Sequence, residues 1–368
     1  MRYLMKVKKK ECMPTDKSSL IALEKIIKKS RVHFYKPIQI AEILYHHRTE
    51  EGWNLVDLES YRNLSKRWRD EISTILIGRK CTSSQKFQDN LFEGNAIPPN
   101  LLNILGDINK KNNGIIEGFI YKSIEDRLSS LMEVLQYIEN TQNEEFSLAH
   151  LLSKFTSNPG LKRSIDKMYE IIVYALFATI VRFLKAEVTI EIGNQDLEVL
   201  KDFENFIEMV LGITGSNTKL VFPAALHRVG VTNAADRGLD MWANFGPAIQ
   251  VKHLSLTMEL VEDIVEEITA DRIVIVCLDS ERDRIENLLN QVGWGSKIQG
   301  VITSHDLDEW YSLCLKSKYK ETLGKNLLGD LNREFVSEFP SSEEMMPFFE
   351  TRGYHKVEIP NSLIQADN

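Results

Sequence analysis

The sequence predicts an α/β fold in which a sheet-containing C-terminal half follows a mainly α-helical N-terminal half. Before about residue 155, apolar side chains recur every three or four positions, the spacing of amphipathic helices. Beyond it, short apolar runs typical of buried strands alternate with helical segments. The 368 residues are 43% hydrophobic and 27% charged, which is enough for two domains with their own cores. We therefore expect a helical domain over 1–155, an α/β core over 156–320 and a C-terminal extension over 321–368.

The N-terminal half contains three segments with clear helical periodicity, at 19–30, 37–47 and 57–78. The second begins with a proline, which suits the first turn of a helix. The third is the longest, and its spacing predicts one buried face formed by Leu58, Tyr61, Leu64, Trp68, Ile72, Ile75 and Leu76.

Basic residues gather on the opposite face of the helix at 57–78 and in the loop at 78–86. Lysine and arginine neutralise phosphates, and arginine also recognises guanine in the major groove. The net charge of −8 gives no overall attraction to nucleic acid, so DNA affinity would have to come from a focused basic surface. For any single residue, an ordinary solvated helix face is the alternative. The group assigned to DNA binding is Arg62, Lys66, Arg67, Arg69, Arg79, Lys80 and Lys86.

The second half alternates between helical and strand-like segments. Strands are expected at 186–192, 227–231, 237–243, 248–254, 272–278 and 297–303. Helices are expected at 164–184, 195–212, 258–269, 281–292 and 305–315. This order predicts a sheet covered by helices.

Polar residues interrupt two of these predicted strands. Asp240 lies alone among apolar residues in 237–243, and Gln250 and Lys252 lie in 248–254. Because strand side chains alternate in direction, these three can share one face of a hairpin. The opposite face would consist of Leu239, Met241, Ile249 and Val251. This separation requires an odd number of residues in the connection, or a bulge. We predict this register, with Asp240 opposite Gln250 or Lys252.

An acid, an amide oxygen and an ammonium group in one place suit a divalent metal site. Asp240 can bind Mg²⁺ directly, while the side chain of Gln250 and the backbone carbonyl of Val251 can supply further oxygen ligands. Lys252 can orient or deprotonate the attacking water, or stabilise charge on a phosphate. The alternative is a buried Asp–Lys ion pair beside a hydrogen-bonded glutamine.

This hairpin and the order of elements around it resemble the core of the PD-(D/E)xK nuclease superfamily. Gln250 stands where that motif has an acid, as in the Mrr-like D…QxK variant, and Leu239 replaces the proline. The resemblance implies a glutamate on the helix before the sheet, for which Glu170 is the candidate. A glutamate at the polar edge of the helix, paired with Lys167, is the alternative.

A wider resemblance covers most of the chain. Segments 34–48, 66–92, 164–177 and 229–256 resemble the HaeII family of type II restriction endonucleases. The resemblance implies Mg²⁺-dependent cleavage of double-stranded DNA at RGCGCY. Residues before the catalytic strand could also touch DNA, and these are Thr232, Asn233 and Arg237.

A palindromic target is matched most simply by a homodimer with one active site for each strand. A host that carries such an enzyme needs a cognate DNA methyltransferase to protect its own DNA. The four cysteines form no CxxC pair, and no stretch suits a signal peptide or membrane helix, so we expect a prokaryotic cytoplasmic protein. Three alternatives stay open: a nuclease of the same fold with another target, such as a modification-dependent or junction-cleaving enzyme; an inactive DNA-binding protein; and a protein-interaction scaffold.

Overall fold

The computed structural model describes residues 16–30, 33–81, 85–92, 96–214, 218–229, 239–252, 270, 272–283, 285–287, 297–340 and 343–357. Contacts divide the chain into two compact units. Unit 1 comprises Met1–Val134, Thr156–Ser164 and Phe339–Asn368. Unit 2 comprises Leu135–Phe155 and Ile165–Glu338. The division differs from the expected boundaries in three places. Residues 135–155 belong with the sheet, residues 156–164 belong with unit 1, and the C-terminal extension is shared between the units.

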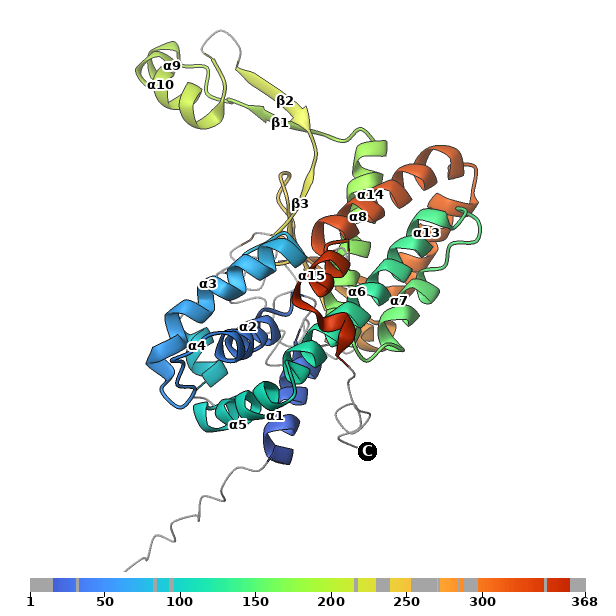
Figure 1. The fold of residues 1–368 in the computed structure, drawn as a ribbon. Coiled ribbons are helices and arrows are strands. Elements are labelled where there is room, and N and C mark those ends of the chain that lie inside the picture. The colour runs from blue at the N-terminus through green and yellow to red at the C-terminus, as the bar shows by residue number, and fades with distance from the viewer. Residues whose placement is uncertain are drawn as a thin grey trace, which may run out of the picture. The chain divides into compact units, whose positions relative to one another are not determined.

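Unit 1 is helical, as its periodicity predicts. Its helices are α1 (Asp16–Lys29), α2 (Tyr35–Thr49), α3 (Leu58–Ile77), α4 (Gln85–Phe92), α5 (Pro99–Lys111), the first part of α6 (Ile115–Asn140), and α15 (Met345–Arg352) (Figure 1). The Asp57 side chain caps the start of α3 by accepting from the Glu59 amide, and Gly78 ends the helix at a φ of 72°. Leu64 and Ile75, which were expected on the buried face of α3, are exposed.

The C-terminal segment of unit 1 is fastened to the other helices through buried acids. Arg352 Nη2 lies 3.1 Å from Glu42 Oε2, and the guanidinium stacks on the Tyr45 ring. Tyr354 donates to Glu117 Oε2 over 2.9 Å. Glu42 is 1% exposed, and burial raises its pKa. A carboxylate in this position depends on its cation.

Substitution of Arg352 by alanine is expected to destabilise unit 1 by about 3 kcal/mol, because Glu42 would keep its burial and lose its charge partner. Urea denaturation of the full chain measures this change. Arg282→Ala is the matched control, since Arg282 pairs with the half-exposed Glu286 and no measurable loss is expected there. Equal stability of the two variants would contradict the assignment.

Unit 2 is built on a mixed sheet with the strand order β3-β4-β5-β6-β7. Strands β3 (Leu226–Arg228), β4 (Met241–Ala243) and β5 (Ala248–Val251) are antiparallel, whereas β6 (Ile273–Cys277) and β7 (Ile298–Thr303) run parallel to β5. The alternation of strands and helices therefore predicted this sheet correctly, although the helix expected at 258–269 lies outside the described residues.

Helices pack on this sheet and on one another. Helix α8 (Ile165–Phe183) contacts β3 and β5, while α13 (Ser304–Lys316) contacts β7 and α8. The hydroxyl of Tyr311 in α13 donates to the carbonyl of Ile172 over 3.0 Å. Helix α14 (Lys325–Glu338) runs beside α8 (Figure 1). The remaining helix of this unit is α7 (Leu148–Thr156).

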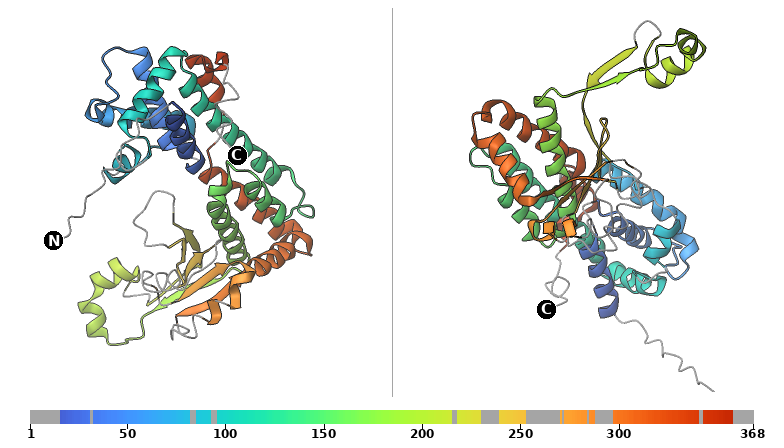
Figure 2. Two further views of the ribbon diagram at one scale, coloured as in Figure 1. Left: turned by 90° about the horizontal axis from the view of Figure 1, so that it is seen from below. Right: turned by 180° about the vertical axis from the view of Figure 1, so that it is seen from behind.

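The strand expected at 186–192 and the helix expected at 195–212 do not belong to the five-stranded sheet and its covering helices. Strand β1 (Glu187–Glu191) pairs with β2 (Lys219–Pro223) in a separate two-stranded sheet. The helix expected at 195–212 is broken into α9 (Leu197–Asp202), α10 (Glu204–Phe206) and a π-helical turn at Ile207–Leu211. Together they form a hairpin with a helical tip, which extends from the rest of unit 2 (Figure 2).

Candidate active site

The hairpin of β4 and β5 has the register that the sequence predicts. Met241 pairs with Ile249 and Trp242 with Ala248, and the Ala243 amide donates to the Pro247 carbonyl over 2.9 Å. An odd-numbered loop, residues 244–246, therefore joins the strands, with a φ of 121° at Gly246. Extended by one pair, this register sets position 240 opposite position 250.

Beyond the Met241–Ile249 pair, the side chain of Asp240 contacts the backbone of β5. Its Oδ2 accepts from the Val251 amide over 2.8 Å, while its backbone carbonyl accepts from the Val229 amide over 2.9 Å. Burial raises the pKa of Asp240, and the Val251 amide, Lys252 and Lys167 oppose that rise. Asp166 adds to the rise, so the carboxylate is held at the end of the strand between two lysines and a second acid.

Gln250 is buried on the sheet face that carries Ala248 and, by the parallel register, Ile275. It is 1% exposed, and its Oε1 has no hydrogen-bond partner among the described residues. Leu239 packs against the cluster that contains Ala248 and Ile275. The expectation that Leu239 shares the face of Met241 is therefore wrong, because position 239 precedes β4 and strand alternation does not extend to it.

Glu170 faces this hairpin from helix α8. It is 7% exposed, and its Oε2 lies 2.6 Å from Lys167 Nζ. Burial, followed by the charge of Asp240, raises the pKa of Glu170 to about 7, whereas Lys167 and Arg228 lower it. The ion pair that we weighed as the alternative for Glu170 is present. However, the glutamate is also buried and electrostatically coupled to Asp240.

Two cations lie near these acids, Lys167 and Arg228, and only Lys167 was anticipated from the sequence, as the partner of Glu170 in the structural alternative. Lys167 stands one helical turn before Glu170, a spacing visible in the sequence. Arg228, in β3, is anchored by Glu334 and Glu338 of α14, with its Nη1 2.7 Å from Glu338 Oε2. Those partners lie more than a hundred positions further along the chain, so no local pattern could have revealed them.

The oxygen atoms gathered here suit a hard divalent cation. The half-buried Asp240 carboxylate is electrostatically coupled to the buried Glu170 carboxylate, and the buried Gln250 Oε1 remains unsatisfied among the described residues. The described residues contain no group of three or more His, Cys, Asp and Glu side chains that could hold a metal. A site here would therefore need amide or carbonyl oxygens. Within the described part of the chain, no ion pair joins Asp240 to Lys252, unlike in the simple structural alternative.

Glu170 should make the stability of the metal-free protein depend on pH. Its pKa of about 7, against an ordinary value of 4.5, means that the folded state holds a proton which the unfolded state has released. Stability should therefore fall as pH rises from about 4.5 to 7, by on the order of 3 kcal/mol. Glu170→Gln should match the native protein at pH 5 and exceed it at pH 8 in urea denaturation without metal.

Glu286→Gln, at a half-exposed position on a surface ion pair, serves as the control for this prediction and should leave the pH profile unchanged. If Glu170→Gln instead lowers stability at pH 8, the pair with Lys167 is a net stabilising contact. Burial of Glu170 would then not raise its pKa as expected.

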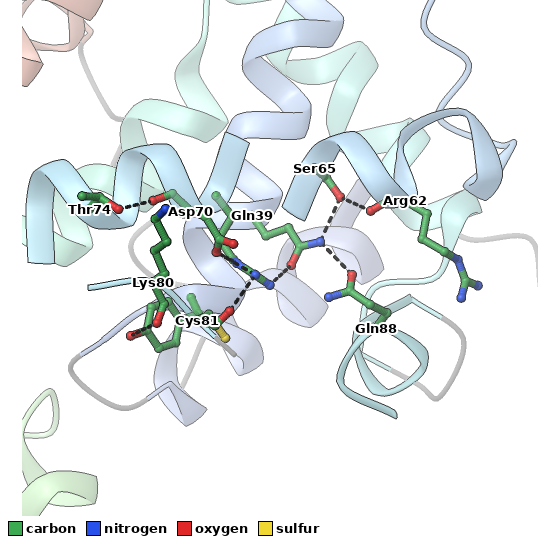
Figure 3. Close-up of polar contacts among 10 residues, drawn as sticks. Gln39, Arg62, Ser65, Asp70, Thr74, Lys80, Cys81 and Gln88 are labelled. Atoms are coloured by element: carbon green, nitrogen blue, oxygen red, sulfur yellow. Dashed lines mark hydrogen bonds and ion pairs between the residues drawn. The ribbon is translucent and has the colours of Figure 1, made fainter. Parts of the chain in front are cut away.

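The basic surface assigned to DNA binding loses one member, Arg69. Arg69 is fully buried, and its guanidinium donates to Asp70 Oδ1, Gln39 Oε1 and the Cys81 carbonyl. Gln39 in turn donates to Ser65 and Gln88, so the network joins α2, α3 and α4 (Figure 3). An arginine buried in this way cannot touch a phosphate. We therefore assign Arg69 to support of the loop that begins at Gly78.

The other members differ in how available they are. Arg62 is mostly buried and is paired with Glu59 and Asp89. Arg67 and Lys80 are exposed, whereas Lys66 and Arg79 are half-buried. Lys86 lies in α4, but its side chain is outside the described set, as are the whole residues Thr232, Asn233 and Arg237.

Comparison with known proteins identifies the family. The profile of the HaeII restriction endonuclease family matches residues 19–354. The chain is 50% identical over 338 residues to the type II restriction enzyme HaeII of Haemophilus aegyptius, covering 91% of this chain and 96% of that protein. It is 51% identical over 336 residues to the type II restriction enzyme NgoBI of Neisseria gonorrhoeae, covering 90% and 95% respectively. No solved structure matches it.

The chain therefore belongs to the HaeII restriction endonuclease family. It is a type II site-specific deoxyribonuclease, an enzyme class that acts on double-stranded DNA. In the described part of the chain, no helix is long and apolar enough to cross a membrane.

Proposed function

We propose that this chain hydrolyses phosphodiester bonds of double-stranded DNA at RGCGCY in a Mg²⁺-dependent reaction, with the β4–β5 hairpin as the active site of a PD-(D/E)xK-like core. The observation that carries the proposal is the contact between Asp240 and the Val251 amide. It brings the acid of one strand to the QxK segment of the next. The antiparallel β3–β4–β5 meander, the parallel β6 and the preceding helix α8 support this core.

Asp240, Gln250 and Val251 would hold the cation. A strand residue directs its N–H and its C=O toward the same neighbouring strand, so the Val251 carbonyl lies on the side of Asp240. The Gln250 Oε1, unsatisfied among the described residues, would provide a neutral oxygen in place of a second strand carboxylate. When bound, a divalent cation offsets charge on the scissile phosphate and favours an anionic nucleophile.

The other proposed site residues, Lys252 and Glu170, would act on the attacking water, on the phosphate and on the charge of the cation site. Lys252 follows Gln250 at the end of β5 and is fixed by its own amide, which donates to the Val276 carbonyl over 2.8 Å. Its ammonium would orient the attacking water and stabilise charge on the phosphate. Glu170 would supply the negative charge that Gln250 lacks, with Lys167 holding the carboxylate in place.

The exposed cations of unit 1 are proposed to contact DNA phosphates. Arg67→Gln and Lys80→Gln should each weaken binding of a cognate duplex without Mg²⁺. Each should also reduce the slope of log K against log salt by about 1, because one phosphate contact is lost. Fluorescence anisotropy at several salt concentrations measures this slope. Lys25→Gln, an exposed lysine of α1, is the control, and an equal effect of all three would show that only total charge matters.

Digestion of unmethylated plasmid DNA with and without Mg²⁺, followed by sequencing of the fragment ends, tests the proposed function. Discrete fragments that end in RGCGCY half-sites and vanish in EDTA are expected. Discrete fragments at another sequence would overturn the assigned target. DNA binding without cleavage would favour the inactive DNA-binding protein. We further propose a prokaryotic cytoplasmic setting, a homodimeric enzyme and a cognate methyltransferase in the same host.

A further inference from the structure

Residues 186–214 and 218–224 form an arm on unit 2. Strands β1 and β2 make its stem, the segment from α9 to the π-helical turn makes its tip, and the Ala224 amide closes its base by donating to the Ala186 carbonyl over 2.8 Å (Figure 2). The proposed chemistry uses none of these residues.

The stem of the arm has an apolar face that is partly exposed to solvent. Strand alternation and the pairing register put four apolar side chains on one face, and each is only half-buried. They are Val188, Ile190, Leu220 and Phe222. A two-stranded hairpin is at best marginally stable in water unless another element packs on its apolar face. We therefore expect another element to pack against the apolar face of the stem.

The tip carries a second uncovered apolar surface. Val199, Phe203, Phe206 and Val210 recur at the spacing of a helix stripe, and they are 38%, 59%, 56% and 62% exposed. Met209 beside them is 86% exposed. Soluble monomers seldom expose contiguous apolar patches larger than a few hundred Å². Side chains of this size present a patch on the order of 500 Å².

The charge of the arm decides which kind of partner fits it. Residues 186–224 contain seven acids and two lysines. This surplus of negative charge repels DNA, so the apolar surface does not suit a nucleic-acid contact. Glu187 and Glu191 lie on the stem face opposite the apolar one. Glu204 and Glu208 lie on the opposite side of the tip from its apolar stripe, by helical spacing. Two such arms can meet through their apolar surfaces while these four acids point away from the contact.

We propose that the arm is a dimerisation element, and that it packs against the arm of a second copy of this chain. The choice of a second copy rests on the proposed function, since a palindromic duplex cut in both strands needs two active sites related by a two-fold axis. A two-fold contact is self-complementary, so the same apolar surface serves both partners. Stem and tip together approach the roughly 800 Å² per partner of a standard interface.

Sedimentation velocity of the full-length protein tests the proposal directly. The native chain should sediment as a dimer at micromolar concentration, and the double variant Phe203→Ser/Phe206→Ser as a monomer, with the dissociation constant raised at least about 100-fold. Both positions are more than half exposed, so the fold should survive. Val56→Ser/Val336→Ser removes equally exposed apolar side chains elsewhere and should leave the dimer intact. A monomeric native chain, or a dimer unaffected by the arm substitutions, overturns the proposal.

A photo-crosslinking residue in place of Met209 identifies what covers the tip. Crosslinks between two chains that map to residues 186–224 of both are expected. Crosslinks within one chain, to another surface of the partner or to added DNA would each overturn arm-to-arm packing. The two readouts need no nuclease activity, so failure of the arm and failure of the proposed function are distinguishable. If the native chain cuts DNA and the arm variants stay dimeric, the dimerisation role of the arm is refuted while the proposed function stands.

Discussion

Asp240→Asn is expected to lower the cleavage rate of a cognate duplex by at least about 1,000-fold while leaving DNA binding within a few-fold of native. The asparagine is nearly isosteric, and its carbonyl can still accept from the Val251 amide, so the hairpin geometry should persist. The negative charge is what disappears, and with it the strongest proposed cation ligand. Single-turnover cleavage of an end-labelled duplex and anisotropy without Mg²⁺ measure the two quantities.

Asp308→Asn provides the control for that substitution, because Asp308 is an exposed acid on α13, away from the hairpin. Its cleavage rate should equal the native rate. If Asp240→Asn cuts within ten-fold of the native enzyme, Asp240 is a structural acid that terminates β4, and the active site lies elsewhere.

Lys252→Met is expected to lower the cleavage rate to a similar extent for a different reason. Methionine preserves the unbranched side chain and removes only the ammonium group that would orient water and stabilise phosphate charge. The proposed cation ligands remain, so Mg²⁺ should still raise the melting temperature of this variant. Asp240→Asn should abolish that rise. The two substitutions therefore separate loss of the cation from loss of the ammonium group.

Lys316→Met, at an exposed position near the end of α13, controls for the loss of one positive charge. It should cleave DNA at the native rate. A Lys252→Met variant that loses the Mg²⁺-dependent stabilisation would mean that Lys252 organises the cation site itself. A variant that keeps most of its activity would remove Lys252 from the chemistry altogether.

The hairpin register was predicted from the polar pattern and not from the turn. Only a connection with an odd number of residues, or a bulge, places Asp240 on the face of Gln250 and Lys252, and the observed register sets position 240 opposite position 250. Leu239 was misplaced because no local pattern shows where β4 begins. The strand at 186–192 was recognised by its alternation, but alternation does not say which strand pairs with it. The separate sheet with β2 could therefore not be foreseen.

Arg69 illustrates a different limit. Positions 61, 65, 69, 72 and 76 follow one face of α3, and all five side chains are buried. The spacing alone would have placed Arg69 on that face, but its charge suggested the surface. Its acceptors Gln39 and the Cys81 carbonyl come from segments on either side of α3. Burial of an arginine depends on such non-local partners, so charge is a poor guide to its position.

Directed backbone cleavage by Fe²⁺ in place of Mg²⁺ tests most directly whether the β4–β5 hairpin holds the catalytic cation. With ascorbate and peroxide, bound Fe²⁺ generates radicals that cut the nearest polypeptide, and mass spectrometry locates the cuts. The account predicts cuts beside Asp240 and Val251 that disappear with excess Mg²⁺ and in Asp240→Asn. Cuts confined to other segments, or cuts at the hairpin that persist in Asp240→Asn, would contradict it.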